Sequence, residues 1–198
     1  MFIDLVSGKD VERLNNQEFR TVLNALITAE AGQQRISLLD VDLTTRETDP
    51  DAGIDGRLKW PNVSHEIFVA GENVVQFKSG KLPVRILRAE FTKPGVQQAL
   101  KSGGNYLLLV GHDYVHQSII RLRTTLRELC REKRIPAKRA KIIFGSAIGR
   151  WISRHPAVVA LPELRKNIID FVTVKRWREE NRQYSNPYNP DESRLTML

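Results

Sequence analysis

Cysteine is nearly absent from this sequence, and so are long apolar runs. Cys130 is the only cysteine in 198 residues, which excludes an internal disulfide, and one cysteine with four histidines cannot build a closed Cys/His zinc site. The longest apolar runs are strand-sized, well short of the roughly 18 residues that a membrane span needs. The first residues, MFIDLVSGKD, lack a basic region followed by a long apolar stretch. We therefore expect a cytoplasmic protein with no secretory signal and no membrane contact.

Acidic residues are outnumbered, and the common nucleotide motifs are missing. The 23 acids face 31 lysines and arginines, and the resulting net charge of +8 favours a polyanionic partner such as DNA or RNA. There is no G-x-x-x-x-G-K-[ST] pattern, so no Walker-type phosphate loop is predicted, and we find no internal repeat. A hydrophobic share of 41% over this length is typical of one globular domain with its own core.

Hydrophobic spacing predicts alternating helices and strands. An amphipathic helix follows Asn15 and Asn16 and ends near Gly32, because apolar residues recur there every three or four positions. The other predicted elements are strands at 35–43, 54–60 and 73–78, a short helix opened by Lys93-Pro94-Gly95, a buried strand at 105–110, a helix after Asp113, a strand at 141–145 and a helix from Ser146. This order indicates an α/β fold.

Three details of this prediction bear on the fold. Leu38 is expected in the core, as part of the first strand, and Asp113 is expected to cap the helix that follows it. The strands at 54–60 and 73–78 both alternate and are expected to pair as antiparallel neighbours. We assign residues 1–161 to one catalytic domain and residues 162–198 to a helical extension with a polar, mobile end.

Three polar residues on the two antiparallel strands carry the candidate chemistry. Gln76 and Lys78 lie two apart and so project from the same face of their strand. Pairing of the strands brings Asp55 against that face. Cleavage of a phosphodiester needs a carboxylate to hold a metal ion, and often a cation near the attacking water or the phosphate. The spacing therefore predicts a metal-dependent hydrolytic site.

Each residue has an expected role in that site. Asp55 would bind Mg²⁺ directly, Gln76 would lend its side-chain oxygen, and the backbone carbonyl of Phe77 would complete the metal shell. Lys78 would position water and offset developing charge. Hard oxygen ligands make Mg²⁺ the expected ion, with Mn²⁺ able to substitute.

The pattern D-P-D-A-G-I-D-G, followed about twenty residues later by V-V-Q-F-K-S-G, resembles the signature of the PD-(D/E)xK nucleases. More narrowly it is similar to the Mrr-like branch, in which glutamine can replace the second acid. The resemblance spans roughly residues 10–155 and implies a restriction-endonuclease-like αβββαβ core, with a mixed central sheet flanked by helices. It maps the metal-binding aspartate onto Asp55 and the Q-x-K pair onto Gln76 and Lys78. It implies an endonuclease that cleaves double-stranded DNA, and the chain shows no recognition domain that would give sequence specificity.

The resemblance also suggests a biological setting. Mrr-like domains with Q-F-K-S-G and a later W-I-S-R-H-P-like segment look like the N-terminal effector domains of bacterial anti-phage proteins that carry a nucleotide-binding sensor. It therefore implies further domains of a larger protein, and a homo-oligomer that places active sites on opposing DNA strands.

Several alternatives stay open at this level. Glu18 sits where a further metal-binding acid often falls, but Asn15-x-x-Glu18 is also a capping arrangement. Asp51, which with Pro50 also reads as a P-D pair, competes with Asp55, although an aspartate in a turn more often bonds its own backbone. Because Gln76 is neutral, the chain could instead be a catalytically silent nucleic-acid-binding or oligomerisation module. An RNA-processing nuclease differs only in substrate. The arginines at 123, 127, 131 and 134 follow either a phosphate backbone or the solvated face of a helix.

Overall fold

A computed structural model describes residues 5–43, 53–61 and 65–165. All of them fall within one compact unit that reaches residue 167. Asp51 lies outside the described residues, as does most of the predicted extension beyond residue 161.

The described chain contains the predicted order of a helix, three strands, a helix, a strand, a helix, a strand and a helix, with further short helices added. The helices are α1 (Gly8–Glu12), α2 (Asn16–Gln33), α3 (Val84–Phe91), α4 (Pro94–Lys101), α5 (His116–Glu132), α6 (Gly145–Ser153), α7 (Pro156–Val159) and α8 (Pro162–Arg165), with 3₁₀ turns η1 (Leu38–Asp40) and η2 (Ala137–Arg139). The strands are β1 (Val41–Leu43), β2 (Gly56–Trp60), β3 (Gly71–Lys78), β4 (Asn105–Val110) and β5 (Ala140–Phe144).

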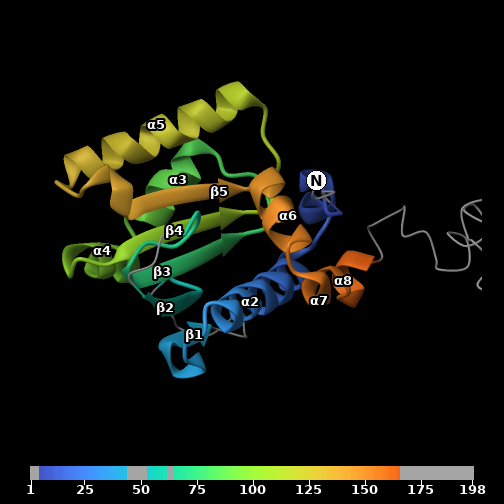
Figure 1. The fold of residues 1–198 in the computed structure, drawn as a ribbon. Helices are drawn as coiled ribbons and strands as arrows, with labels where there is room; N and C mark the ends of the chain where they lie inside the picture. The colour runs from blue at the N-terminus through green and yellow to red at the C-terminus, as the bar shows by residue number, and fades with distance from the viewer. Residues whose placement is uncertain (1–4, 44–52, 62–64, 166–198) are drawn as a thin grey trace, which may run out of the picture. The chain divides into compact units, whose positions relative to one another are not determined.

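The strands form one mixed sheet in the order β1-β2-β3-β4-β5 (Figure 1). β1, β2 and β3 are successive antiparallel neighbours, whereas β4 and β5 join in parallel. The parallel strands need helical crossovers, and α3 with α4 and then α5 supply them. The predicted α/β class, the mixed sheet and the antiparallel pairing of the second and third strands are therefore confirmed.

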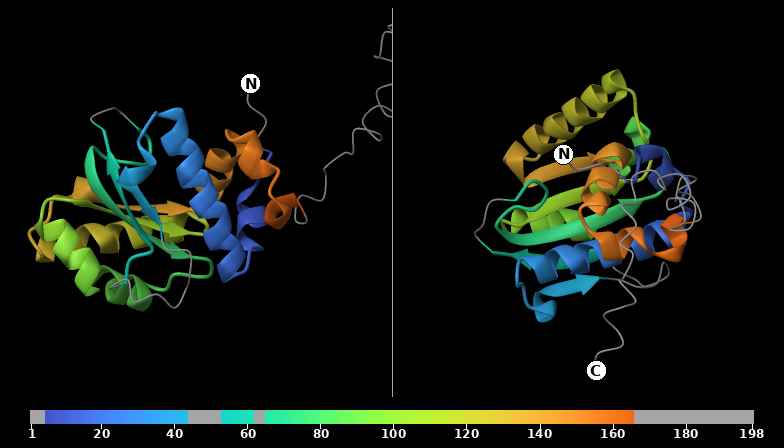
Figure 2. Two further views of the ribbon diagram at one scale, coloured as in Figure 1. Left: turned by 90° about the horizontal axis from the view of Figure 1, so that it is seen from below. Right: turned by 45° about the vertical axis from the view of Figure 1, so that its right-hand side comes forward.

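Helices cover both faces of the sheet (Figures 1 and 2). On one face, apolar side chains from β3, β4 and β5 pack with α3, α4 and α5 in a core that contains Val74, Tyr106, Ile142, Leu87, Val96 and Leu126. On the other face lies α2, whose Arg20 guanidinium stands 5.8 Å from the ring centroid of Phe77. No helix in the described part of the chain is both long and apolar enough to pass through a bilayer.

Local details differ from the prediction at three places. Leu38 is 64% exposed, because Ser37 caps a 3₁₀ turn there and only Val41–Leu43 reaches the sheet, at its edge. Asp113 does not cap α5, which begins after Val115 without a side-chain cap; its carboxylate instead accepts a hydrogen bond from Ser146. A helix that the sequence pattern did not reveal, α3, lies between β3 and α4.

A buried carboxylate joins α2 to the last helices. Glu30 is 6% exposed, and its Oε2 accepts hydrogen bonds from Trp151 Nε1 at 2.6 Å and from His155 Nε2 at 2.9 Å. Its Oε1 lies 3.2 Å from His65 Nε2. Because Nδ1 of His65 accepts from two backbone N–H groups that follow it, the ring proton of the neutral tautomer is on Nε2 and faces Glu30. Burial opposes ionisation of Glu30, but the hydrogen bonds outweigh it and lower its pKa.

Candidate active site

Asp55 stands directly before β2 and faces β3. Gly56 is opposite Val75 in the antiparallel register, and Asp55 is the residue just before this paired stretch. The backbone N–H of Asp55 also donates to the carbonyl of Val75 at 2.8 Å. Asp55, Gln76 and Lys78 line the same cavity, but their partners differ: Asp55 binds Arg20 on α2, whereas Gln76 and Lys78 contact Glu90 on α3.

The carboxylate of Asp55 is held in a fixed orientation. It is 8% exposed; its Oδ1 lies 2.6 Å from a guanidinium nitrogen of Arg20, and its Oδ2 accepts from the backbone N–H of Phe77 at 2.6 Å. A buried carboxylate must be charge-compensated or protonated, and Arg20 supplies the compensating charge from α2. Arg20 was not identified from sequence, where it reads as one polar residue on a helix.

The amide of Gln76 has one orientation that satisfies its neighbours. Its Nε2 donates to Oε2 of Glu90, and its Oε1 accepts from the hydroxyl of Tyr106 at 2.7 Å. The reverse orientation would set the amide oxygen against a carboxylate that has no proton to donate. Burial raises the pKa of Tyr106 well above its ordinary value, and the charges of Glu90 and Asp55 raise it further, so the hydroxyl stays protonated and donates.

Glu90 is the functional candidate that the sequence did not reveal. It lies on α3, is 6% exposed, and binds two ammonium groups, with Lys78 Nζ 2.7 Å from Oε1 and Lys93 Nζ 2.7 Å from Oε2. Burial raises the pKa of the Glu90 carboxyl, but the hydrogen bonds from Lys78 and Lys93 outweigh it and hold the pKa below 4.5. A signal exists in the sequence: Glu90 falls between Leu87 and Phe91, on the apolar stripe of its helix.

Asp55, Gln76 and Lys78 border an open cavity of about 380 Å³. Its lining residues are Asn16, Arg20, Gly53, Asp55, Gln76, Phe77, Lys78, Ser79, Gly80, Lys81 and Lys93. Four of them are cationic and only Asp55 is anionic, so the cavity attracts an anion while keeping a carboxylate at its wall.

Gly53 and Lys93 meet closely at the rim of the cavity. Gly53 has φ +86°, a conformation that L side chains rarely adopt, and a Cβ at this position would lie 2.3 Å from Cδ of Lys93. The G-x-D pattern thus has a local reason, since only glycine lets the turn before Asp55 pass over the lysine that reaches Glu90.

The two other predicted metal ligands are Glu18 and Phe77. Glu18 forms a capping box with Asn15: its side chain accepts from the Asn15 backbone N–H at 3.0 Å, and its own N–H donates to the Asn15 side chain at 2.9 Å. Glu18 does not line the cavity, whereas Phe77 does and offers its backbone N–H to Asp55. Among the described residues, no group of three or more histidine, cysteine, aspartate or glutamate side chains is arranged to hold a metal ion.

Comparisons of the chain with protein-family models, with curated proteins and with solved structures found no match in any of the three.

Proposed function

We propose that this chain is a metal-dependent endonuclease domain that cleaves phosphodiester bonds of double-stranded DNA, on a restriction-endonuclease-like core. One observation carries the proposal: a cationic cavity is lined by the buried carboxylate of Asp55 and by Gln76 and Lys78, which both contact the buried carboxylate of Glu90. The order of α2, then β1 to β3, then helices and β4 agrees with the order that such a core requires.

The donor set suits Mg²⁺, with a change of one expected ligand. In proteins Mg²⁺ is bound through one or two carboxylates and keeps several of its waters, so a cluster of three acids is not required. Asp55 and Glu90 would hold the ion. Gln76 would position Glu90 instead of binding the metal, because its oxygen already accepts from Tyr106. When bound, the ion would neutralise charge on the phosphate and lower the pKa of a coordinated water.

The lysines of the site match the phosphate that a nucleic acid would bring. Lys78 and Lys93 both contact Glu90, and each side chain is 34% exposed, so each ammonium group can also reach a ligand in the cavity. Lys78 would hold the attacking water or the scissile phosphate, and Lys93 would bind a phosphate oxygen next to it. Arg20 would hold the carboxylate of Asp55 in its orientation.

The test is cleavage of supercoiled plasmid with Mg²⁺ or Mn²⁺ by the full chain and by Asp55→Asn, Glu90→Gln and Lys78→Met. We expect each variant to lose at least about a hundredfold in rate, as is usual when a group that acts on the transition state is removed. Lys59→Ala, an exposed lysine on β2, changes the charge on the same strand and is the matched control. Titration with Mn²⁺ alone should show weaker binding in Asp55→Asn and Glu90→Gln. Undiminished cleavage by these two variants would remove the catalytic assignment.

A second candidate function has its own observation. The ion pair of Asp55 with Arg20, and the commitment of the Gln76 oxygen to Tyr106, also suit a silent module that binds nucleic acid without cutting it. Retention of DNA by the full chain, with neither Mn²⁺ binding nor cleavage, would favour this candidate. An oligoribonucleotide of the same length distinguishes an RNA substrate in either case.

A further inference from the structure

Most of the net charge of the protein is carried by one segment. Residues 116–141, which run from α5 to the start of β5, contain nine lysines and arginines and two glutamates, a net charge of +7 out of +8 for the whole chain. Only 26 of 198 residues are involved. Such a concentration of charge gives the surface of this segment a strong positive electrostatic potential.

A groove of about 270 Å³ lies within this segment, between α5 and β5. Four consecutive residues of β5, Ala140 to Ile143, line it together with α5 and η2. Successive side chains of a strand point to opposite faces, so four in a row border one groove only where it follows the edge of the strand. β5 ends the sheet among the described residues, and this edge therefore presents backbone N–H and C=O groups to the groove.

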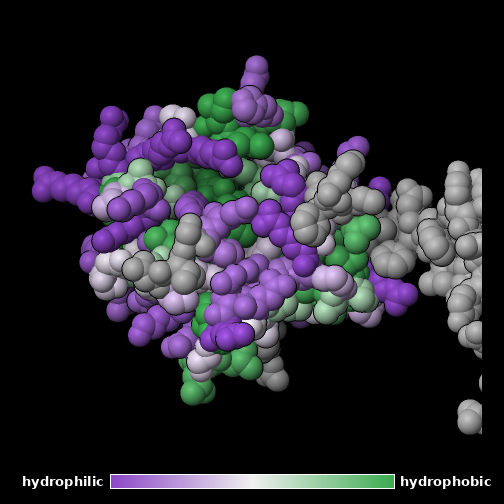
Figure 3. All heavy atoms as spheres, viewed as in Figure 1, coloured by the Kyte–Doolittle hydropathy of each residue, from purple (hydrophilic) through white to green (hydrophobic). Residues whose placement is uncertain are grey.

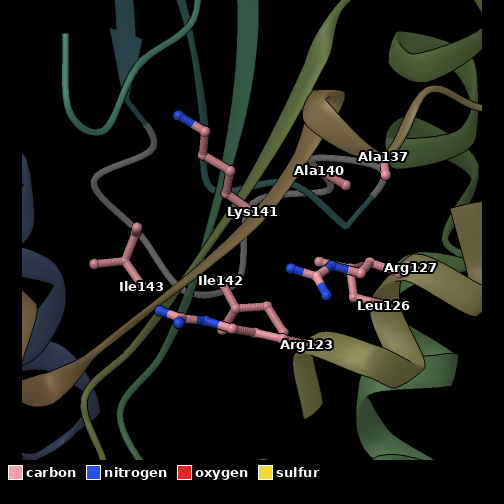
Figure 4. Close-up of a pocket in the computed structure, with 8 residues that line it drawn as sticks. All are labelled: Arg123, Leu126, Arg127, Ala137, Ala140, Lys141, Ile142 and Ile143. Atoms are coloured by element: carbon pink, nitrogen blue, oxygen red, sulfur yellow. The ribbon is translucent and has the colours of Figure 1, made fainter. Parts of the chain in front are cut away.

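The walls of the groove combine charge with apolar surface. Arg123 and Arg127 extend from α5 toward β5, while Leu126 and Ile142 form an apolar floor (Figure 4). The space-filling view shows apolar side chains in a hollow with hydrophilic side chains around it, where Figure 1 places α5 and β5 (Figure 3). The guanidinium of Arg123 stands 5.8 Å from the ring centroid of Phe144, which directs it along the strand.

We propose that this groove binds an extended, acidic peptide segment, which adds as a sixth strand to the edge of β5. Backbone groups of the segment would pair with β5, its carboxylates would meet Arg123 and Arg127, and its alternate apolar side chains would rest on Leu126 and Ile142. The inference uses neither Asp55 nor Glu90 and is independent of the proposed nuclease activity.

The charge of the segment selects among the possible occupants. A second copy of the chain that paired through its own β5 would set two surfaces of +7 against each other, which opposes association. Single-stranded nucleic acid is held by stacking on aromatic side chains, and the groove has none in its lining. An acidic strand can pair its carboxylates with the arginines and its backbone groups with the edge of β5.

The experiment measures fluorescence anisotropy of a labelled, end-capped peptide of about eight residues in which glutamate and valine alternate, added to the full chain. The same peptide with every backbone nitrogen methylated keeps its charge and cannot pair as a strand. We expect the methylated peptide to bind at least about tenfold more weakly, and the double variant Arg123→Glu/Arg127→Glu to weaken binding of the parent peptide by about tenfold or more. Arg121→Glu/Arg131→Glu, exposed on the same helix but outside the groove, changes the charge equally and should cost about twofold at most.

Three results would overturn the proposal. The first is equal binding of the methylated and parent peptides, since pairing with β5 would then play no part. The second is an equal loss in the two double variants, which would mean that only the overall field attracts the peptide. The third is tight binding of a DNA duplex of roughly 20 base pairs that the groove variant alone abolishes, with no binding of either peptide. Because the methylated probe is compared on the unaltered protein, misfolding of a variant cannot mask the outcome.

Discussion

The side-chain amide of Gln76 donates a hydrogen bond to Oε2 of Glu90, so the neutral residue of the Q-x-K pattern is joined to a carboxylate from α3. The site therefore contains a second carboxylate, although position 76 itself is neutral. Gln76 fixes the orientation of an acid that arrives from the next helix, and Lys78, two residues on, holds the other oxygen of the same carboxylate at 2.7 Å.

Gln76→Glu tests whether a cation can enter this arrangement. Two carboxylates at hydrogen-bond distance cannot both stay ionised without compensation. We expect the variant to lose about 1–3 kcal/mol in free energy of unfolding in the presence of EDTA, and to regain most of it in Mn²⁺, measured by urea denaturation near neutral pH. Gln98→Glu, exposed on α4, is the control for the added charge. An equal loss with and without Mn²⁺ would count against a metal ion bound beside Glu90.

Tyr106→Phe tests the hydrogen bond that the hydroxyl of Tyr106 donates to Gln76. Removal of the hydroxyl leaves the buried Oε1 of Gln76 without its donor, which costs about 1–3 kcal/mol of stability. We also expect slower plasmid cleavage, because the orientation of Glu90 depends on Gln76. Tyr114→Phe removes a hydroxyl that accepts from the Leu82 N–H and should lower stability alone. If cleavage falls equally in both variants, Tyr106 has no special role in positioning.

Gly53→Ala tests the turn before Asp55. The variant must tolerate both a positive φ and a Cβ that meets the side chain of Lys93, so we expect a loss of about 1–3 kcal/mol and weaker DNA binding. Gly71→Ala is the control, because Gly71 has a similar positive φ of +97° but nothing lies within 4 Å of the new Cβ. Its loss of stability measures the cost of the backbone conformation alone. Equal losses in stability and unchanged DNA binding in the two variants would show that contact with Lys93 does not matter.

Acidification should weaken the fold through Glu90. Its pKa is held below 4.5 in the folded state, so its contribution to stability is complete above that pH and is lost as the pH falls through the lowered folded value. We expect the urea midpoint of Glu90→Gln to change less than that of the unaltered protein below pH 4.5. Glu72→Gln, which removes an exposed partner of Arg57, should leave the pH dependence as it is. Parallel curves for all three proteins would contradict this assignment.

The parts of the site that lie on paired strands could be predicted from the sequence. Alternation marks β2 and β3, and their antiparallel pairing brings Asp55, just before β2, beside the end of β3 that carries Gln76 and Lys78. The helix that carries Glu90 was missed because its sequence, VRILRAEF, is only two turns long and has no side-chain cap. A single glutamate beside arginines in such a segment is indistinguishable from a solvated charge until its neighbours are known to be buried.

Contacts between strands that are far apart in the chain could not be predicted from the sequence either. The apolar run NYLLLV predicts β4 and its burial, but not that the hydroxyl of Tyr106 meets Gln76, since nothing local sets the parallel register. Leu38 shows a different error. Its place in an alternating stretch predicts a strand, but Ser37 caps a 3₁₀ turn that contains Leu38. Patterns along the chain indicate which elements form, and tertiary contacts decide which polar groups meet.

The hydrogen bonds that Glu30 receives also constrain when the protein can fold during its synthesis. Two of its donors, Trp151 and His155, follow it by more than 120 positions, so a growing chain on the ribosome holds this carboxylate before these two partners have been made. Until they emerge, burial of Glu30 is unfavourable, which opposes the docking that the apolar face of α2 favours. Nascent chains that end before residue 155 should therefore remain open to proteases, and protection should arise late and within a short span of further elongation.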